Sequence, residues 1–85
     1  MEVRILYFAS LRESLQTSGE TVEVPEQVRT AGDLRLWLVA RGAPFAEVLG
    51  AGRAVRMSVE QAMANAGTPL TDGAEVAFFP PVTGG

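Results

Sequence analysis

Polar and apolar residues alternate in four stretches of the chain, and this two-residue period predicts β-strands. In the first stretch, Val3, Ile5 and Tyr7 point to one face of the predicted sheet. The first and last stretches are apolar on their second face as well, which predicts that they are neighbours in the centre of the sheet. The four stretches cover residues 2–9, 20–24, 54–60 and 74–79.

The main helix is predicted over residues 31–41, where apolar residues recur at intervals of three and four. Thr30 supplies a hydroxyl at the expected N-cap, and Asp33 places an acid in the first turn. Gly42 follows the last periodic residue, as is typical of a helix C-terminus. The apolar stripe, which we assign to the core, consists of Leu34, Trp37, Leu38 and the aliphatic stem of Arg41.

Three shorter elements complete the pattern. Ser10 and Glu13 have the spacing of a capping box, which predicts a short helix over residues 11–16. A helical turn is predicted over 44–49 and a minor edge strand over 62–64. The Asp-Gly pair that precedes the last stretch is a tight-turn signal.

The order of these elements predicts an α+β fold, with a mixed sheet crossed on one face by one main helix. This is the arrangement of the ubiquitin-like β-grasp. We expect one domain over residues 1–81 and a flexible tail over 82–85. No repeat or linker indicates a second domain.

The composition excludes several classes of function. The chain contains no cysteine and no histidine, which removes disulfides, cysteine-ligated metals and Ser-His or Cys-His hydrolases, and no metal site is expected. All seven basic residues are scattered arginines and the net charge is −3, so no basic stripe indicates nucleic-acid binding. No apolar run reaches the length of a membrane span, and we expect a cytoplasmic protein.

The C-terminal tail carries the main chemical signal. Glycine has no Cβ, so Gly84 and Gly85 form a thin end that fits a narrow channel. Pro80 and Pro81 cannot donate ladder hydrogen bonds, and we expect them to end the last strand and aim the tail away from the domain. The terminal carboxylate is ionised at neutral pH and could attack the α-phosphate of ATP to form an acyl-adenylate.

The residues before this end resemble a known family. Leu70-Thr71-Asp72-Gly73-Ala74-Glu75-Val76-Ala77-Phe78-Phe79-Pro80-Pro81-Val82-Thr83-Gly84-Gly85 resembles the C-terminal signature of the MoaD-like sulfur carriers, the small subunits of molybdopterin synthase. The segment from Val3 to Glu13 and the helix start at Asp33 are similar to the same family. Glu60-Gln61 departs from the expected Asn-Gln pair, which puts the turn after the third strand in doubt.

The resemblance implies a sulfur-donating subunit that is not catalytic alone. Gly85 would be adenylated and converted to a thiocarboxylate, and would then donate sulfur to cyclic pyranopterin monophosphate in molybdenum cofactor biosynthesis. Gly84 would give clearance, while Val82 and Thr83 would line the channel of the partner. The chain itself would bind no cofactor, because the activating enzyme uses the ATP and the large subunit binds the pyranopterin.

Three kinds of partner follow from the same resemblance. They are the large (MoaE-like) subunit of a heterotetrameric synthase, an E1-like (MoeB-like) adenylating enzyme, and a sulfur donor such as a cysteine desulfurase or a rhodanese. No nucleic acid and no membrane is expected as a partner.

The expected docking surface is the sheet face opposite the main helix. If Val3 and Ile5 face the core, the second face of the central strands is left with apolar side chains, and an exposed apolar patch is typical of an interaction surface. Arg12 could pair with a partner carboxylate. The four expected interface residues are Leu6, Phe8, Ala77 and Phe79.

Three other functions share parts of this pattern. A sulfur carrier for thiamine or another thiolated metabolite would have the same fold and a Gly-Gly end. A ubiquitin-like modifier would form an amide with a target lysine. A non-catalytic β-grasp binding module would leave its tail unmodified, and its function would survive deletion of Gly85.

Overall fold

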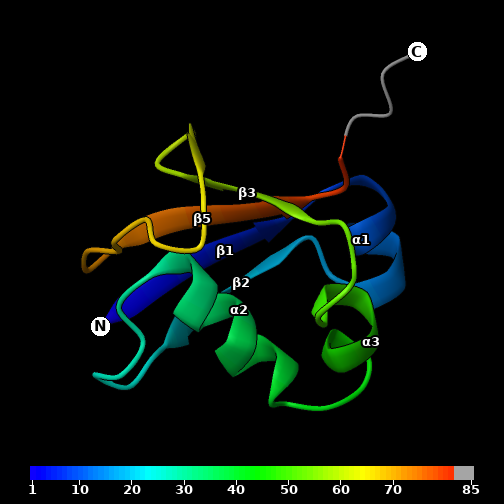
Figure 1. Ribbon diagram of the computed structural model, residues 1–85, viewed down its shortest axis with the longest axis horizontal. Helices are drawn as coiled ribbons and strands as arrows, with labels where there is room; N and C mark the ends of the chain where they lie inside the picture. Colours follow the sequence, from blue (N-terminus) through cyan, green and yellow to red (C-terminus); the bar gives the residue numbers. More distant parts are fainter. Residues whose placement is uncertain (82–85) are drawn as a thin grey trace.

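The computed structural model describes residues 1–81 and has five strands and three helices in one layered unit (Figure 1). The sequence predicts each element, with boundaries that shift by one or two residues. The elements are β1 (Glu2–Tyr7), α1 (Ala9–Leu15), β2 (Gly19–Glu23), α2 (Ala31–Val39), α3 (Phe45–Leu49), β3 (Arg56–Val59), β4 (Ala62–Ala64) and β5 (Ala74–Phe79).

The five strands form one mixed sheet in the order β2-β1-β5-β3-β4. β1 and β5 are parallel neighbours in the middle, and the remaining pairs are antiparallel. Figure 1 shows α2 and α3 on one side of the sheet, with α1 at the end where β1 and β5 finish. The predicted β-grasp arrangement and the central position of the first and last strands are therefore confirmed.

The hydrophobic core lies between the sheet and α2. The side chains predicted to face inward on β1 and β5 are at most 1% exposed, and Leu34 and Leu38 of α2 are fully buried against them. Trp37 is only partly buried and packs at the edge of this core, with the guanidinium of Arg41 5.0 Å from its ring centroid. The apolar stripe of α2 is thus confirmed, with Trp37 at its margin.

One buried hydroxyl connects this core to a charged pair. The hydroxyl of Tyr7 donates a 2.9 Å hydrogen bond to Glu20, whose carboxylate also accepts two hydrogen bonds from Arg41. Burial, reinforced by the hydrogen bond to the anionic Glu20, raises the pKa of Tyr7 well above its ordinary value. Tyr7 therefore stays neutral, and through Glu20 it links β1 to β2 and to Arg41, the second residue after α2.

The N-terminus of α2 is capped as predicted. The Thr30 hydroxyl accepts a 3.1 Å hydrogen bond from the Asp33 amide, and the Asp33 carboxylate accepts one from the Thr30 amide, which completes a capping box. Hydrogen bonds from Arg29, through its amide, and from Thr30 hold the pKa of Asp33 below its usual range. The helix ends at Val39, earlier than predicted, and Gly42 adopts the left-handed conformation three residues later.

Replacing Thr30 by alanine should lower the free energy of unfolding by about 1 kcal/mol, because the Asp33 amide loses its capping acceptor. Urea unfolding followed by the fluorescence of Trp37 measures the change. Thr71→Ala is the matched control, since Thr71 is exposed and its hydroxyl makes no hydrogen bond within residues 1–81. Equal losses in the two variants would contradict the role of the cap.

The predicted capping box at Ser10 is wrong. α1 begins at Ala9 with Phe8 as its N-cap and has no side-chain cap, so Ser10 is already inside the helix. The Phe8 amide donates to the Phe78 carbonyl and extends the ladder between β1 and β5 by one residue. The chain then turns sharply at Ala9, whose φ is +53°, and this tertiary pairing places the helix start ahead of Ser10.

The turn at Glu60-Gln61 forms despite its departure from the family pattern. Both residues have positive φ, 50° and 66°, which is typical of the two-residue type I′ turns that join antiparallel strands such as β3 and β4. Asparagine tolerates this conformation better than glutamate does. The Glu60 carboxylate accepts a 3.0 Å hydrogen bond from the Glu75 amide, a tertiary contact that supports the turn.

Candidate functional site

The candidate site begins where β5 ends. The strand is held between β1 and β3 and finishes at Phe79, directly before the two prolines, as predicted. Pro80 is partly buried and Pro81 is exposed, so the chain leaves the sheet here. Figure 1 shows this exit at the end of the sheet that also carries α1.

The reactive end itself lies outside the described residues. This concerns the predicted acceptor Gly85, the clearance residue Gly84, and the channel residues Val82 and Thr83. Their roles stay predictions. The described residues that precede them form β5, a central strand of the sheet, which supports the base of the tail.

The alternation of the central strands places the predicted docking residues on or beside the outer face of the sheet, away from α2. Leu6 pairs with Ala77 in the β1–β5 register, and the two alternate with the core-facing residues of their strands. Phe8, at the end of β1, is 47% exposed, whereas Leu6 and Phe79 are partly buried. Three of the four side chains are thus accessible to a partner.

Ala77 does not form part of an exposed surface, contrary to the expectation. It is only 5% exposed, because it occupies the central strand between Leu6 on β1 and Ser58 on β3. Its methyl group is shorter than the flanking side chains, which shield it. The alternation therefore predicts the correct face for Ala77, but it does not predict that so short a side chain is covered by its neighbours on that face.

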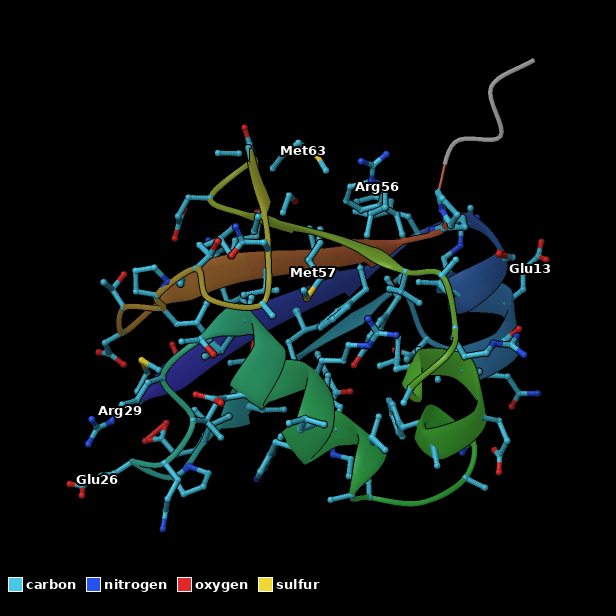
Figure 2. All side chains as sticks on the ribbon, in the orientation of Figure 1. Glu13, Glu26, Arg29, Arg56, Met57 and Met63 are labelled. Atoms are coloured by element: carbon cyan, nitrogen blue, oxygen red, sulfur yellow. The ribbon has the colours of Figure 1, made fainter. Side chains whose placement is uncertain are left out.

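Met63 is an accessible apolar residue of the same face that the sequence analysis missed. It lies opposite Ser58 in the β3–β4 register, and directly opposite residues share a face. It is 62% exposed, and Figure 2 shows it on the side of the sheet away from α2. Once β4 is paired with β3, the polar alternation of β3 assigns Met63 to the outer face. We call Leu6, Phe8, Met63 and Phe79 the outer-face patch.

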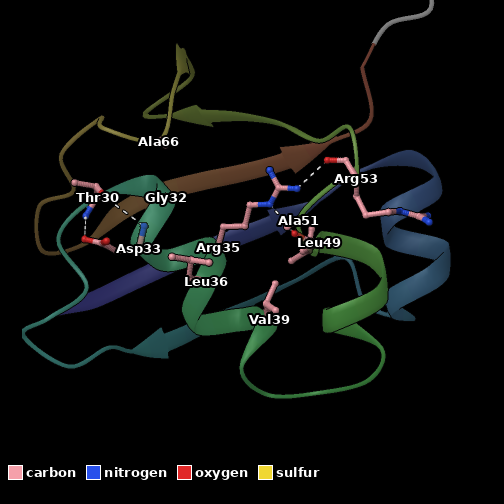
Figure 3. Close-up of a pocket in the computed structure, with 11 residues that line it drawn as sticks. Thr30, Gly32, Asp33, Arg35, Leu36, Val39, Leu49, Ala51, Arg53 and Ala66 are labelled. Atoms are coloured by element: carbon pink, nitrogen blue, oxygen red, sulfur yellow. Dashed lines mark hydrogen bonds between the residues drawn. The ribbon is translucent and has the colours of Figure 1, made fainter.

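A groove of about 550 Å³ lies on the helix side, and no predicted site residue lines it (Figure 3). Its walls come from α2, the loop after α3 and the loop after β4. Arg35 crosses the groove and donates hydrogen bonds to the carbonyls of Leu49, Gly50 and Arg53 at 2.6, 3.1 and 2.9 Å. Because these bonds fix the loop before β3, the role of Arg35 is structural.

Two further findings concern residues 1–81. No group of three or more acidic side chains is placed to hold a metal ion there. None of the helices in this part of the chain has the length and apolar character needed to cross a bilayer.

The chain was compared with known proteins. Residues 5–85 match the model of the ThiS family. The molybdopterin synthase sulfur carrier subunit of Escherichia coli (strain K12) is 40% identical over 83 residues, which is 98% of this chain and 99% of that protein.

Two solved structures have similar folds. SAMP1, a small archaeal modifier protein from Haloferax volcanii, is 26% identical with a TM-score of 0.76, and the match covers 100% of both chains. The second is one chain of the complex of subunits 1 and 2 of the molybdopterin-converting factor from Helicobacter pylori 26695. It matches over 100% of both chains with a TM-score of 0.67, and at 23% identity this likeness shows the fold alone. The family match covers nearly the whole chain and includes the Gly-Gly end. This chain therefore belongs to the ThiS family and is similar, over nearly its full length, to the sulfur carrier subunits of molybdopterin synthase.

Proposed function

We propose that this protein is the sulfur carrier subunit of a molybdopterin synthase. The observation that carries the proposal is the 40% identity to the Escherichia coli sulfur carrier subunit over 98% of the chain. The composition supports it, because a chain without cysteine has no side chain that could hold sulfur as a persulfide. The terminal carboxylate is then the group to be modified.

The proposed chemistry has two stages before transfer. A carboxylate oxygen of Gly85 attacks the α-phosphate of ATP on an E1-like enzyme, which forms the acyl-adenylate and releases pyrophosphate. A persulfide from a cysteine desulfurase or a rhodanese then attacks the acyl carbon and displaces AMP. A second thiol cleaves the sulfur–sulfur bond, which leaves a thiocarboxylate on Gly85 and a disulfide on the donor.

The transfer step requires the tail to enter a second subunit. The thiocarboxylate sulfur bonds to a carbon of the cyclic pyranopterin monophosphate held by the large subunit. Water then cleaves the bond between this sulfur and the acyl carbon, which releases Gly85 as a carboxylate. The Escherichia coli relative, which is 40% identical, is a subunit of molybdopterin synthase by name, and this supports a heteromeric assembly for this chain as well. Because the first stage consumes ATP, we place the cycle in the cytoplasm. The chain binds no cofactor in any of these steps.

Labelling of the terminus tests the proposal directly. Protein isolated from its native host should react with an alkylating reagent such as N-ethylmaleimide, because a thiocarboxylate is nucleophilic and no cysteine competes with it. Tandem mass spectrometry should place the label on Gly85. Protein made in a host that lacks the activating enzyme is the control. Absence of label in native protein that supports cofactor synthesis would refute the proposal.

The same preparation separates the alternatives. Recovery of the large, pterin-binding subunit with the labelled chain supports the molybdopterin pathway, whereas a labelled chain that restores only thiamine synthesis supports the other kind of sulfur carrier. Conjugates in which Gly85 forms an amide with a target lysine would support a modifier, the class of the Haloferax volcanii neighbour. A β-grasp binding module would show neither label nor conjugates.

Replacing Phe79 by alanine should weaken the complex with the large subunit by about tenfold, because truncating an accessible aromatic at an interface typically costs 1–2 kcal/mol of binding. Calorimetric titration measures the dissociation constant. Leu36→Ala is the matched control, since Leu36 is 69% exposed on α2, away from the outer-face patch. Equal affinities for the wild type and Phe79→Ala would exclude Phe79 from the interface.

A further inference from the structure

The charged residues are distributed unevenly between the two ends of the molecule. Figure 2 shows Glu26 and Arg29 at one end of the molecule, and Glu13 and Arg56 at the end where the tail leaves. The net charge of the whole chain is −3, yet three arginines gather at the second end. We call Arg12, Arg53 and Arg56 the tail-end arginines.

Secondary structure places these arginines around the base of the tail. Arg56 is the first residue of β3 and pairs with Phe79, the last residue of β5. Arg12 lies in α1, which contacts β5 and whose N-cap Phe8 donates its amide to Phe78. Arg53 belongs to the loop that leads into β3, and Figure 3 shows its side chain directed away from the groove toward α1.

The tail-end arginines also differ in their contacts from three of the other four arginines. The fourth, Arg4, is exposed and its guanidinium makes no hydrogen bond or ion pair within residues 1–81, but it lies in the middle of β1, opposite Glu75 of β5. Arg35 and Arg41 are committed to loop carbonyls and to Glu20, and Arg29 donates to the Glu26 carbonyl. Within residues 1–81, the three tail-end guanidinium groups make no hydrogen bond and no ion pair, and all three residues are exposed. Their charge is therefore available to a partner.

Acidic residues prevail at the opposite end. Glu2 and Glu23 are cross-strand partners, and the Asp72 carboxylate accepts a 2.7 Å hydrogen bond from the Glu2 amide. With Glu26 there are four exposed carboxylates. The basic groups near them are Arg29, the N-terminal amine, which lies 3.7 Å from the Glu23 carboxylate, and Arg4, which is two residues from Glu2 on the same face of β1. At the tail end, by contrast, the three arginines outnumber the two exposed glutamates, which are Glu13 of α1 and Glu47 of α3.

We infer that the tail-end arginines form a docking site for an acidic protein surface around the channel that receives the tail. This inference rests on the proposed function and adds the charge of the partner's surface. Arginine suits such a contact, because its planar guanidinium binds carboxylates in a bidentate manner. The acidic opposite end would be repelled by the same surface, so the charge distribution orients the tail toward the channel.

Long-range attraction of this kind acts mainly on the rate of association. Charge complementarity raises association rates by ten- to a thousandfold, and salt screens the effect over a distance of about 8 Å at 0.15 M ionic strength. The apolar outer-face patch would supply most of the affinity after contact. The contribution of the tail-end arginines can therefore be measured in the association rate, and that of the outer-face patch in the affinity.

The experiment uses the molybdopterin synthase large subunit of the same organism as the probe. Stopped-flow mixing gives association rate constants at about 0.02 M and about 0.15 M salt. The triple variant Arg12→Gln, Arg53→Gln, Arg56→Gln should associate about tenfold more slowly at low salt, and the difference should shrink at higher salt. Single Arg56→Gln and Arg29→Gln variants remove the same charge at opposite ends, and only the first should slow association.

Each outcome decides one question. A triple variant as fast as the wild type, or an Arg29→Gln variant as slow as Arg56→Gln, would overturn the inference and leave the proposed function standing. If the wild type forms no complex and its terminus carries no sulfur, the proposed function fails, and the inference fails with it. Calorimetric binding of ATP to the isolated wild type, lost in the triple variant, would show that the arginines serve a phosphate instead. Unchanged thermal unfolding of the variants controls for folding.

Discussion

Deletion of Gly85 should abolish sulfur transfer while leaving the domain folded. The shortened chain still ends in a glycine carboxylate, but an extended residue spans about 3.5 Å, so this carboxylate falls short of the reacting position by that distance. Reacting atoms must approach to about 3–3.5 Å, and a displacement of even 1 Å can cost about a hundredfold in rate. Restoration of molybdopterin synthesis in cells that lack the native protein measures the loss.

Two controls make this deletion informative. Ser14→Ala changes an exposed residue of α1 and should restore synthesis fully. A chain lengthened by one glycine keeps the Gly-Gly end but moves the terminal carboxylate beyond the reacting position. Like the deletion, it should not restore synthesis. Retained activity in both tail variants would mean that the terminus is not the sulfur-bearing group, because such chemistry depends on the position of the last carbon.

Replacing Phe78 by alanine should have the largest effect on stability, a loss of about 3–5 kcal/mol in the free energy of unfolding. Phe78 is fully buried in the middle strand and stacks against Tyr7 at 6.1 Å between ring centroids. Small domains have total stabilities near the lower end of about 5–15 kcal/mol, so this variant should be close to unfolding. Urea denaturation monitored through Trp37 measures the loss.

Phe79→Ala is the matched control for this change. It removes the same side chain from the next residue, which points to the opposite face and is only partly buried, and it should cost about 1 kcal/mol. Phe78→Ala should thus impair folding, whereas Phe79→Ala should impair mainly binding. Similar losses of stability in the two variants would contradict the assignment of the two faces.

The sequence was sufficient to predict the fold because its local signals agree with its tertiary structure. The alternation in β1 and β5 marks both faces correctly, and the capping box of α2 forms from Thr30 and Asp33 as the spacing indicates. The spacing of Ser10 and Glu13 predicts a capping box equally well, but these two residues form no cap. A hydrogen bond from Phe8 to a residue 70 positions away decides that helix start, and no local pattern contains it.

The candidate site could be predicted only in part for a similar reason. The tail is a linear motif, so its residues can be identified without knowledge of the fold. The outer-face patch depends on strand order, which determines that Ala77 is shielded between two neighbours and that Met63 is accessible. The tail-end arginines are scattered in the sequence, and only the folding of α1 and β3 around the end of β5 brings them to one end of the molecule.

The central position of β5 also has a consequence for biosynthesis. During translation β1, β2, β3 and β4 emerge before β5. In the described sheet β1 and β3 do not pair with each other, because β5 lies between them. The middle of the sheet is therefore completed by the segment made last, and such long-range pairing cannot form before it has left the ribosome. A chain truncated ahead of Ala74 would leave β1 and β3 each with an unpaired edge, so incomplete molecules would be prone to aggregation and proteolysis.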